Sequence, residues 1–157
     1  MNIKILGAFA AVALLAACAT PPTAATSGSG ATVATAGVVP GSQEDLVKNV
    51  GDRVFYAFNK SQLSSAAHAT LDKQAAWLKQ YMQNNVQVAG NCDDRGTEEY
   101  NIALGQRRAN AARDYLVAKG VAGSRITTIS YGKDRPTAMG DNEQAWAQNR
   151  NAITSVR

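Results

Sequence analysis

Two adjacent carboxylates and one distant arginine are the side chains of this sequence whose types and spacing could do chemistry. Asp93 and Asp94 end an apolar run, and Arg108 follows Asp93 by fifteen residues. Like charges in neighbouring positions repel, so the pair needs a reason: a solvated turn, a metal site or a pocket for a cationic ligand. Arg108 lies on the predicted buried face of a helix, where an unpaired charge is costly.

Two interpretations of this group are open. In the first, Arg108 and one aspartate form a satisfied ion pair with a purely structural role. In the second, the charges are held slightly apart and bind a zwitterion: the ammonium of an amino acid contacts Asp93, and its carboxylate takes the bidentate fork of Arg108. The second interpretation predicts a cleft at the carboxyl end of the strand before Asp93.

The elements that must position these groups alternate between strand and helix. Strands rich in β-branched and aromatic residues are expected at 53–58, 86–90, 125–132 and 150–157. Helices are expected at 42–52, 66–83 and 98–119, with a helical turn possible in the connection 133–149. Ser42, Ser64 or Ser65, and Thr97 are candidate N-caps, and Gly51 and Gly120 are candidate stops. One buried stripe of the third helix is predicted to comprise Tyr100, Leu104, Arg108, Ala111 and Tyr115. This alternation predicts an α/β sandwich with helices packed on a sheet.

The first residues have the composition of a secretory signal peptide. Lys4 precedes an apolar run, 5–17, that is too short for a bilayer span of roughly 20 residues. The sequence Leu15-Ala16-Ala17-Cys18 looks like a lipobox, which implies that 1–17 are removed and that Cys18 carries lipid. The alternative is an ordinary signal peptide that contains a cysteine. By the sorting rule associated with enteric lipoproteins, Asp after the lipidated cysteine retains a protein at the inner membrane, so Ala19 implies the outer membrane, with the domain in the periplasm.

The rest of the chain divides into a linker and one domain. Residues 18–41 are mostly Ala, Thr, Ser, Gly and Pro, which predicts a flexible tether, and 42–157 are long enough for one modest domain. Once Cys18 is acylated, Cys92 is the one remaining thiol, so no intrachain disulfide is expected. The formal charge of +4 includes no long basic run, which argues against nucleic-acid binding. Neither a metal nor a cofactor is expected, because Cys92, Asp93 and Asp94 are adjacent on a strand end and point to opposite sides.

The segment "GNCDDRGTEEYNIALGQRRANAARDYL", residues 90–116, resembles the signature of the OmpA-like peptidoglycan-binding domain family. The matching positions are Gly90, Asp93, Tyr100, Asn101, Leu104, Arg108 and Ala109. The similarity extends over about 53–157. It implies a two-layer sandwich with a mixed four-stranded sheet. It also implies a non-catalytic module that holds the diaminopimelate residue of peptidoglycan stem peptides.

The resemblance also implies roles for particular residues and partners. Asp93 carries over as the ammonium partner and Arg108 as the carboxylate fork, with Leu104 and Thr97 as pocket wall and loop contacts. Phe58 and Asn59 match a Phe-Asp step of the family, with Asn here in place of the more usual Asp. The implied partners are peptidoglycan, the outer membrane through the lipid anchor, and TolB with other Tol proteins, in a Tol-Pal system that maintains the envelope and acts in cell division.

Several other assignments stay open. A peptidoglycan-processing enzyme is the main rival class, but it would need a zinc set, a Cys–His pair or two opposed carboxylates. The chain offers one histidine, His68, which is expected at a helix surface or boundary. Asn91 stands where many members of the family have His and is expected to be a polar residue at the solvent edge. Arg150 is expected to tie down the long connection, with a place near the acidic pocket as the alternative.

Overall fold

The computed structural model describes residues 37–157, and these contain one four-stranded mixed sheet. The strands are β1 (Arg53–Phe55), β2 (Val86–Asn91), β3 (Ile126–Gly132) and β4 (Asn151–Val156), in the order β1-β4-β2-β3. β2 and β3 are parallel, whereas β4 is antiparallel to both β1 and β2. This confirms the mixed sheet. The predicted signal peptide, Cys18 and most of the predicted linker lie outside the described residues.

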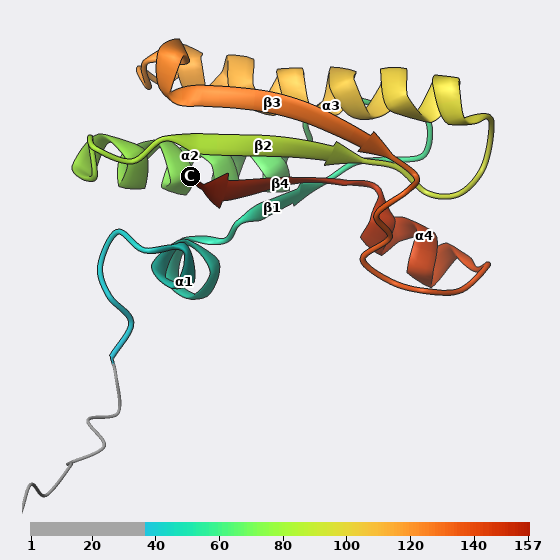
Figure 1. The fold of residues 1–157 in the computed structure, drawn as a ribbon, viewed down its shortest axis with the longest axis horizontal. Coiled ribbons are helices and arrows are strands. Elements are labelled where there is room, and N and C mark those ends of the chain that lie inside the picture. Colours follow the sequence, from blue (N-terminus) through green and yellow to red (C-terminus); the bar gives the residue numbers. More distant parts are fainter. Residues whose placement is uncertain (1–36) are drawn as a thin grey trace, which may run out of the picture. The chain divides into compact units, whose positions relative to one another are not determined.

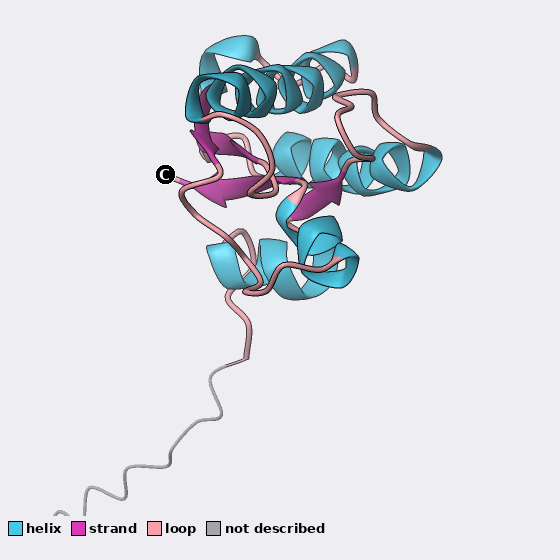
Figure 2. Cartoon of the chain, turned by 90° about the vertical axis from the view of Figure 1, so that its right-hand side faces the viewer, coloured by secondary structure: helices cyan, strands magenta, loops and turns pink. Residues whose placement is uncertain are grey.

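The two longest helices cover one face of this sheet. α1 (Gln43–Asp45) continues as a π-helical turn, Leu46–Val50, and is followed by α2 (Ser65–Gln80), α3 (Glu98–Ala118), a 3-10 turn at Gly123–Arg125, and α4 (Glu143–Asn149). In Figure 1, α2 and α3 lie behind the sheet, and the side view in Figure 2 shows the opposite face of the sheet open. Between residues 37 and 157, no helix is both long and apolar enough to cross a bilayer.

Local signals in the sequence set the ends of these helices. The side chains of Ser42, Ser64 and Thr97 each accept a hydrogen bond from the backbone N–H three residues later, so all three N-cap predictions are confirmed. Gly51 and Gly120 have φ of 97° and 91°, the left-handed conformation in which glycine ends a helix without strain. The helix that reaches the candidate site therefore starts at a defined residue directly after the acidic turn.

The core lies between the sheet and the α2/α3 layer. Val54, Val88, Leu78 and Leu116 are among its side chains with at most 3 % exposure. Trp77 is also buried, and its indole N–H donates to Asp45 Oδ2 at 2.8 Å, which ties the first helical segment to α2. β1 is shorter than predicted, because after Phe55 the chain turns away from the sheet and lines the candidate site.

The predicted stripe of α3 is partly wrong. Tyr100 is 43 % exposed, and Ala111 and Tyr115 are only partly buried. The buried side chains of α3 are Asn101, Leu104, Gly105, Arg108, Ala109, Ala112 and Leu116. Small residues in this set let α3 approach β2 closely, and this packing requirement rotates the helix relative to the prediction from large side chains. Arg108 remains on the buried face.

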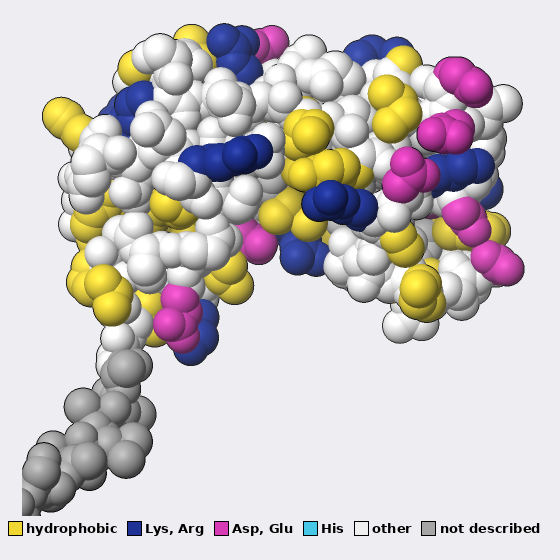
Figure 3. All heavy atoms as spheres, in the orientation of Figure 1, with side chains coloured by type: hydrophobic (Ala, Val, Ile, Leu, Met, Phe, Trp, Pro, Cys, Tyr) yellow, Lys and Arg dark blue, Asp and Glu magenta, His cyan; other side chains and the backbone are white. Residues whose placement is uncertain are grey.

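The open face of the sheet is the one seen in Figure 3. Hydrophobic side chains gather over its middle, and acidic side chains, with basic ones among them, gather at the right-hand end, where α3 begins. A shallow depression on this face is lined by residues of β2, β3 and β4 that include Ala89, Tyr131 and Ile153. The charged end, not the open face, is where the predicted site lies.

Candidate functional site

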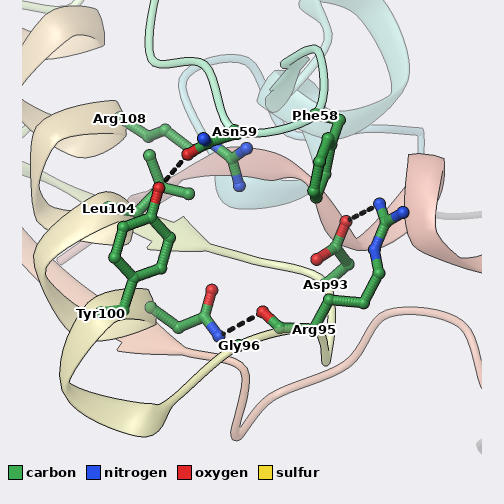
Figure 4. A pocket seen from close by; sticks show the side chains of 9 residues that line it. Phe58, Asn59, Asp93, Arg95, Gly96, Tyr100, Leu104 and Arg108 are labelled. Atoms are coloured by element: carbon green, nitrogen blue, oxygen red, sulfur yellow. Dashed lines mark hydrogen bonds and ion pairs between the residues drawn. The ribbon is translucent and has the colours of Figure 1, made fainter.

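A cavity of about 170 Å³ opens where β2 runs into α3. Figure 4 shows that three segments form it: the chain after β1, the turn after β2, and the first half of α3. Its lining residues are Phe58, Asn59, Asp93, Arg95, Gly96, Tyr100, Asn101, Leu104 and Arg108. Five of the six predicted ligand-binding residues are therefore brought together. The sixth, Thr97, caps α3 and is not part of the lining.

Arg108 is a buried cation held by neutral groups. Its side chain is on a residue with 1 % exposure, and it donates from Nε to the carbonyl of Lys60 at 2.9 Å, from Nη1 to that of Asn91 at 2.8 Å, and from Nη2 to that of Ala57 at 3.2 Å. A guanidinium has five N–H donors, so two remain after these three bonds. Burial lowers the pKa of Arg108, although a guanidinium stays charged at neutral pH.

The ion pair that was one interpretation of Arg108 is not formed. No carboxylate of residues 37–157 lies within 4.0 Å of its guanidinium nitrogens. Its position is fixed through its backbone as well, because the hydroxyl of Tyr56 donates to the Arg108 carbonyl at 2.8 Å. Arg108 thus lies at the cavity as a positioned cation that pairs with no carboxylate of residues 37–157.

Asp93 supplies the opposite charge at the same cavity. One carboxylate oxygen, Oδ2, accepts from Arg95 Nη2 at 2.5 Å and from Arg150 Nη1 at 3.2 Å. In Figure 4 the other oxygen points away from Arg95 toward the cavity. Burial acts to raise the pKa of Asp93, but the hydrogen bonds from Arg95 and Arg150 outweigh it, so the pKa is lowered overall. Asp93 is therefore a carboxylate at neutral pH.

The turn that carries Asp93 is held from α3. Asn101, which is 1 % exposed, donates from Nδ2 to the carbonyl of Arg95 at 2.9 Å and to that of Thr97 at 3.1 Å. Gly96 has φ of 94°, which favours glycine at this point of the turn. The turn formed by residues 93–96 is thus a rigid edge of the cavity. Asp94, the second aspartate, is exposed and does not line the cavity.

The opposite wall comes from the segment after β1. Asn59 adopts a left-handed φ of 56°, a conformation that asparagine tolerates better than most residues, and its Oδ1 accepts a hydrogen bond from the hydroxyl of Tyr100. Phe58 is 55 % exposed at the mouth of the cavity. The ring of Phe58 and the side chain of Leu104 give the cavity an apolar stretch between its charged ends.

Two arginines of the site were not fully predicted: Arg95 was not expected there, and Arg150 was expected there only as the alternative placement. Arg95 pairs with Asp93, and its guanidinium carbon lies 4.0 Å from the ring centres of both Phe58 and Trp146. Arg150 lies beside Asp93, the less favoured of its two predicted placements. The sequence allowed Arg150 to be named as a candidate neighbour of the acidic pocket. Its contact with Asp93, however, requires β4 to lie next to β2.

Two further predictions concern the neighbours of the site. Cys92 is buried, its Sγ lies 3.3 Å from the Asn101 carbonyl, and burial raises its pKa, so it packs as a thiol. Asn91 is not at the solvent edge: it is 3 % exposed and donates to Asn151 Oδ1 at 2.8 Å, which corrects the expectation. Between residues 37 and 157, no group of three or more His, Cys, Asp or Glu side chains is placed to hold a metal ion.

Comparison with known proteins identifies the family of the chain. The sequence pattern of the OmpA family matches residues 55–150. The chain belongs to the OmpA family. Within it, the chain is 49 % identical over 156 residues to the peptidoglycan-associated lipoprotein of Mesorhizobium japonicum, covering 97 % of this chain and 90 % of that one. It is 40 % identical over 152 residues to the peptidoglycan-associated lipoprotein of Pasteurella multocida, covering 96 % and 95 %.

Solved structures of other proteins show the same fold. The crystal structure of the peptidoglycan-associated lipoprotein from Burkholderia pseudomallei superposes with a TM-score of 0.66 at 39 % identity, covering 68 % of this chain and 90 % of that one. The C-terminal domain of Helicobacter pylori MotB superposes with a TM-score of 0.63 at 18 % identity, covering 68 % and 84 %, which is a likeness of fold alone. The resemblance of 53–157 to the OmpA-like domain is thereby confirmed.

Proposed function

We propose that this protein binds the diaminopimelate residue of peptidoglycan stem peptides in the cavity between Asp93 and Arg108, without breaking a bond. The observation that carries the proposal is Arg108, which is 1 % exposed and bonded to three backbone carbonyls, with no acid of residues 37–157 to neutralise it. A ligand carboxylate would supply that anion and accept from the two remaining N–H groups.

The rest of the cavity favours a ligand with both charges at one tip. The free oxygen of Asp93 offers a partner for an ammonium, and the apolar wall of Phe58 and Leu104 suits methylene groups. Asn59 offers a hydrogen bond where an aspartate would offer a charge. The end of a diaminopimelate side chain carries one ammonium and one carboxylate on one carbon, and the names of the similar lipoproteins support the same ligand class. A contact from Thr97 stays a prediction.

The wider role that we propose rests on resemblance. Cys18 would anchor the chain in the outer membrane, residues 18–41 would span the distance to the wall, and the domain would tether the two layers in the periplasm. TolB and the other Tol proteins are the proposed protein partners, in a Tol-Pal system that maintains the envelope and acts in division. Metabolic labelling with a palmitate analogue tests the anchor: wild type should be labelled and Cys18→Ser should not.

Co-sedimentation with purified sacculi tests the binding function, and the chain offers matched controls at adjacent positions. Asp93→Asn and Arg108→Lys should lose most of the pelleted fraction. Asp94→Asn and Arg107→Lys change exposed neighbours of the same type and should pellet like wild type. Thermal unfolding of all four variants shows whether the fold is kept. If folded Asp93 and Arg108 variants pellet like wild type, the cavity is not the binding site.

The same sacculi separate a binder from a peptidoglycan-processing enzyme. A binder pellets with the wall and leaves its turbidity and its soluble muropeptides unchanged over hours. An enzyme clears the suspension or releases new fragments. Release of fragments by wild type, lost in Asp93→Asn, would replace the binding proposal with the enzymatic one.

A further inference from the structure

Arg150 and Arg95 both donate to the same oxygen of Asp93, and Arg150 is held in place by further hydrogen bonds. Arg150 is 6 % exposed, and each of its three guanidinium nitrogens is used. Nη1 donates to Asp93 Oδ2 at 3.2 Å, Nε to the Tyr56 carbonyl at 3.1 Å, and Nη2 to Glu143 Oε1 at 2.5 Å. Arg150 therefore joins β4, the segment after β1 and α4, and it is a positioning residue for Asp93.

Arg95 contacts the same oxygen in a different manner. Its side chain is 32 % exposed, one nitrogen, Nη2, reaches Asp93 Oδ2 at 2.5 Å, and its Nε is buried without a hydrogen-bond partner in the described part of the chain. This is a single-ended contact and lacks the two parallel bonds of a bidentate arginine–carboxylate pair. Because Arg150 already holds Asp93, the contact from Arg95 is dispensable for placing the carboxylate.

The guanidinium of Arg95 also makes a second favourable contact, with two aromatic rings. Its guanidinium lies between the rings of Phe58 and Trp146, 4.0 Å from each ring centre. A cation over an aromatic face is attracted by the ring quadrupole, and guanidinium groups stack well on such faces. The guanidinium can therefore give up Asp93 and remain between the two rings.

The charges at the site make such a release necessary for tight binding of a cation. Arg95 and Arg150 both contact Asp93, and the exposed carboxylate of Glu143 lies 2.5 Å from Arg150 and 3.9 Å from Arg95. A ligand ammonium would be a third cation at the Asp93 carboxylate, whereas Arg95 released from Asp93 keeps Glu143 as a neighbouring anion. Cations that share one carboxylate lie within a few Å of each other, and like charges so close repel appreciably in the partly shielded interior of a protein. We infer that Arg95 is an internal competitor for the ligand's ammonium: it occupies Asp93 in the free protein and yields this carboxylate when the ligand binds. This inference rests on the proposed function. It adds that the guanidinium of Arg95 limits the affinity of the site for the ligand's ammonium.

Paired substitutions of the two arginines test the inference. The purified full-length protein is titrated by calorimetry with a diaminopimelate stem peptide and with the same peptide carrying lysine instead. Arg95→Gln should bind both peptides about fivefold more tightly than wild type, which corresponds to about 1 kcal/mol. Both peptides gain because both carry the ammonium, so their affinity ratio should not change. Arg150→Gln should bind more weakly, and Arg107→Gln, an exposed arginine outside the cavity, should match wild type.

The outcomes separate this inference from the proposed function. If wild type binds the diaminopimelate peptide and folded Arg95→Gln binds equally or more weakly, Arg95 is a support and the inference is wrong, while the proposed function stands. If neither wild type nor Arg95→Gln binds, the proposed function fails and the inference fails with it. Nitrogen NMR of the Arg95 guanidinium in wild type gives a second measurement: ligand must shift its signals, and unchanged signals at saturation would also overturn the inference.

Discussion

Gly90 of β2 and Gly105 of α3 are in backbone contact: a Cβ at Gly90 would lie 1.8 Å from the Gly105 carbonyl oxygen. Asp93 follows Gly90 by three residues along the chain, and Arg108 follows Gly105 by three residues on the buried side of α3. This backbone contact between strand and helix therefore lies directly next to the two charges of the site. The distance between strand and helix, and with it the width of the cavity, is set by the absence of two side chains.

Gly90→Ala should prevent this contact and unfold or strongly loosen the domain. A clash of 1.8 Å with backbone cannot be relieved by a rotamer change, so we expect a loss of about 3 kcal/mol or more of unfolding free energy. Urea denaturation measures it. Gly37→Ala is the matched control, because a Cβ there meets nothing within 4 Å. Stability of Gly90→Ala equal to that of Gly37→Ala would refute the close packing.

The contributions of Asp93 to folding stability and to ligand binding should both decrease at acid pH. Its pKa in the folded protein is lowered below the ordinary value of 3.8, so its stabilising contribution is present above that value and is lost as the pH falls through the folded pKa. The difference in unfolding free energy between wild type and Asp93→Asn should therefore be largest above about pH 4 and shrink on further acidification. Denaturant unfolding of both proteins at a series of pH values measures it; a difference that grows as pH falls would contradict the ion pairs.

Tyr56→Phe should loosen Arg108 without touching the cavity wall. The variant removes the hydroxyl that donates to the buried Arg108 carbonyl at 2.8 Å, at a cost of about 1–2 kcal/mol of unfolding free energy. Because the backbone of Arg108 loses a restraint, affinity for the stem peptide should fall a few-fold while the charge at the site is unchanged. Tyr131→Phe on β3 provides the comparison. Equal stability of the two variants would show that the Tyr56 hydroxyl contributes nothing.

Much of the fold and part of the site could be predicted from the sequence because local signals carry them. Ser42, Ser64 and Thr97 cap the helices as expected, since a cap depends on residues within one turn. The meeting of Asp93 and Arg108 at one cavity follows from the spacing between a strand end and a helix face. The burial of Arg108 was also expected from its position among the apolar residues of α3.

Other features depend on contacts that sequence spacing does not specify. The rotation of α3 away from Tyr100 follows from the approach of Gly105 to Gly90, which requires the sheet to be known. Arg150 reaches Asp93 only because β4 lies between β1 and β2, and strand order was not predictable from the pattern. Arg95 was visible beside Asp93, but its stacking between Phe58 and Trp146 joins three separate segments of the chain.

The most direct test of the central claim is a calorimetric titration of the full-length protein with two stem peptides that differ at one residue, diaminopimelate or lysine. Both peptides offer an ammonium to Asp93, but only the diaminopimelate peptide offers a side-chain carboxylate to Arg108. We predict clear binding of the diaminopimelate peptide, at least about tenfold weaker binding of the lysine peptide, and loss of this difference in Arg108→Lys. Equal affinity of wild type for the two peptides would contradict the assignment of Arg108 as the carboxylate receptor.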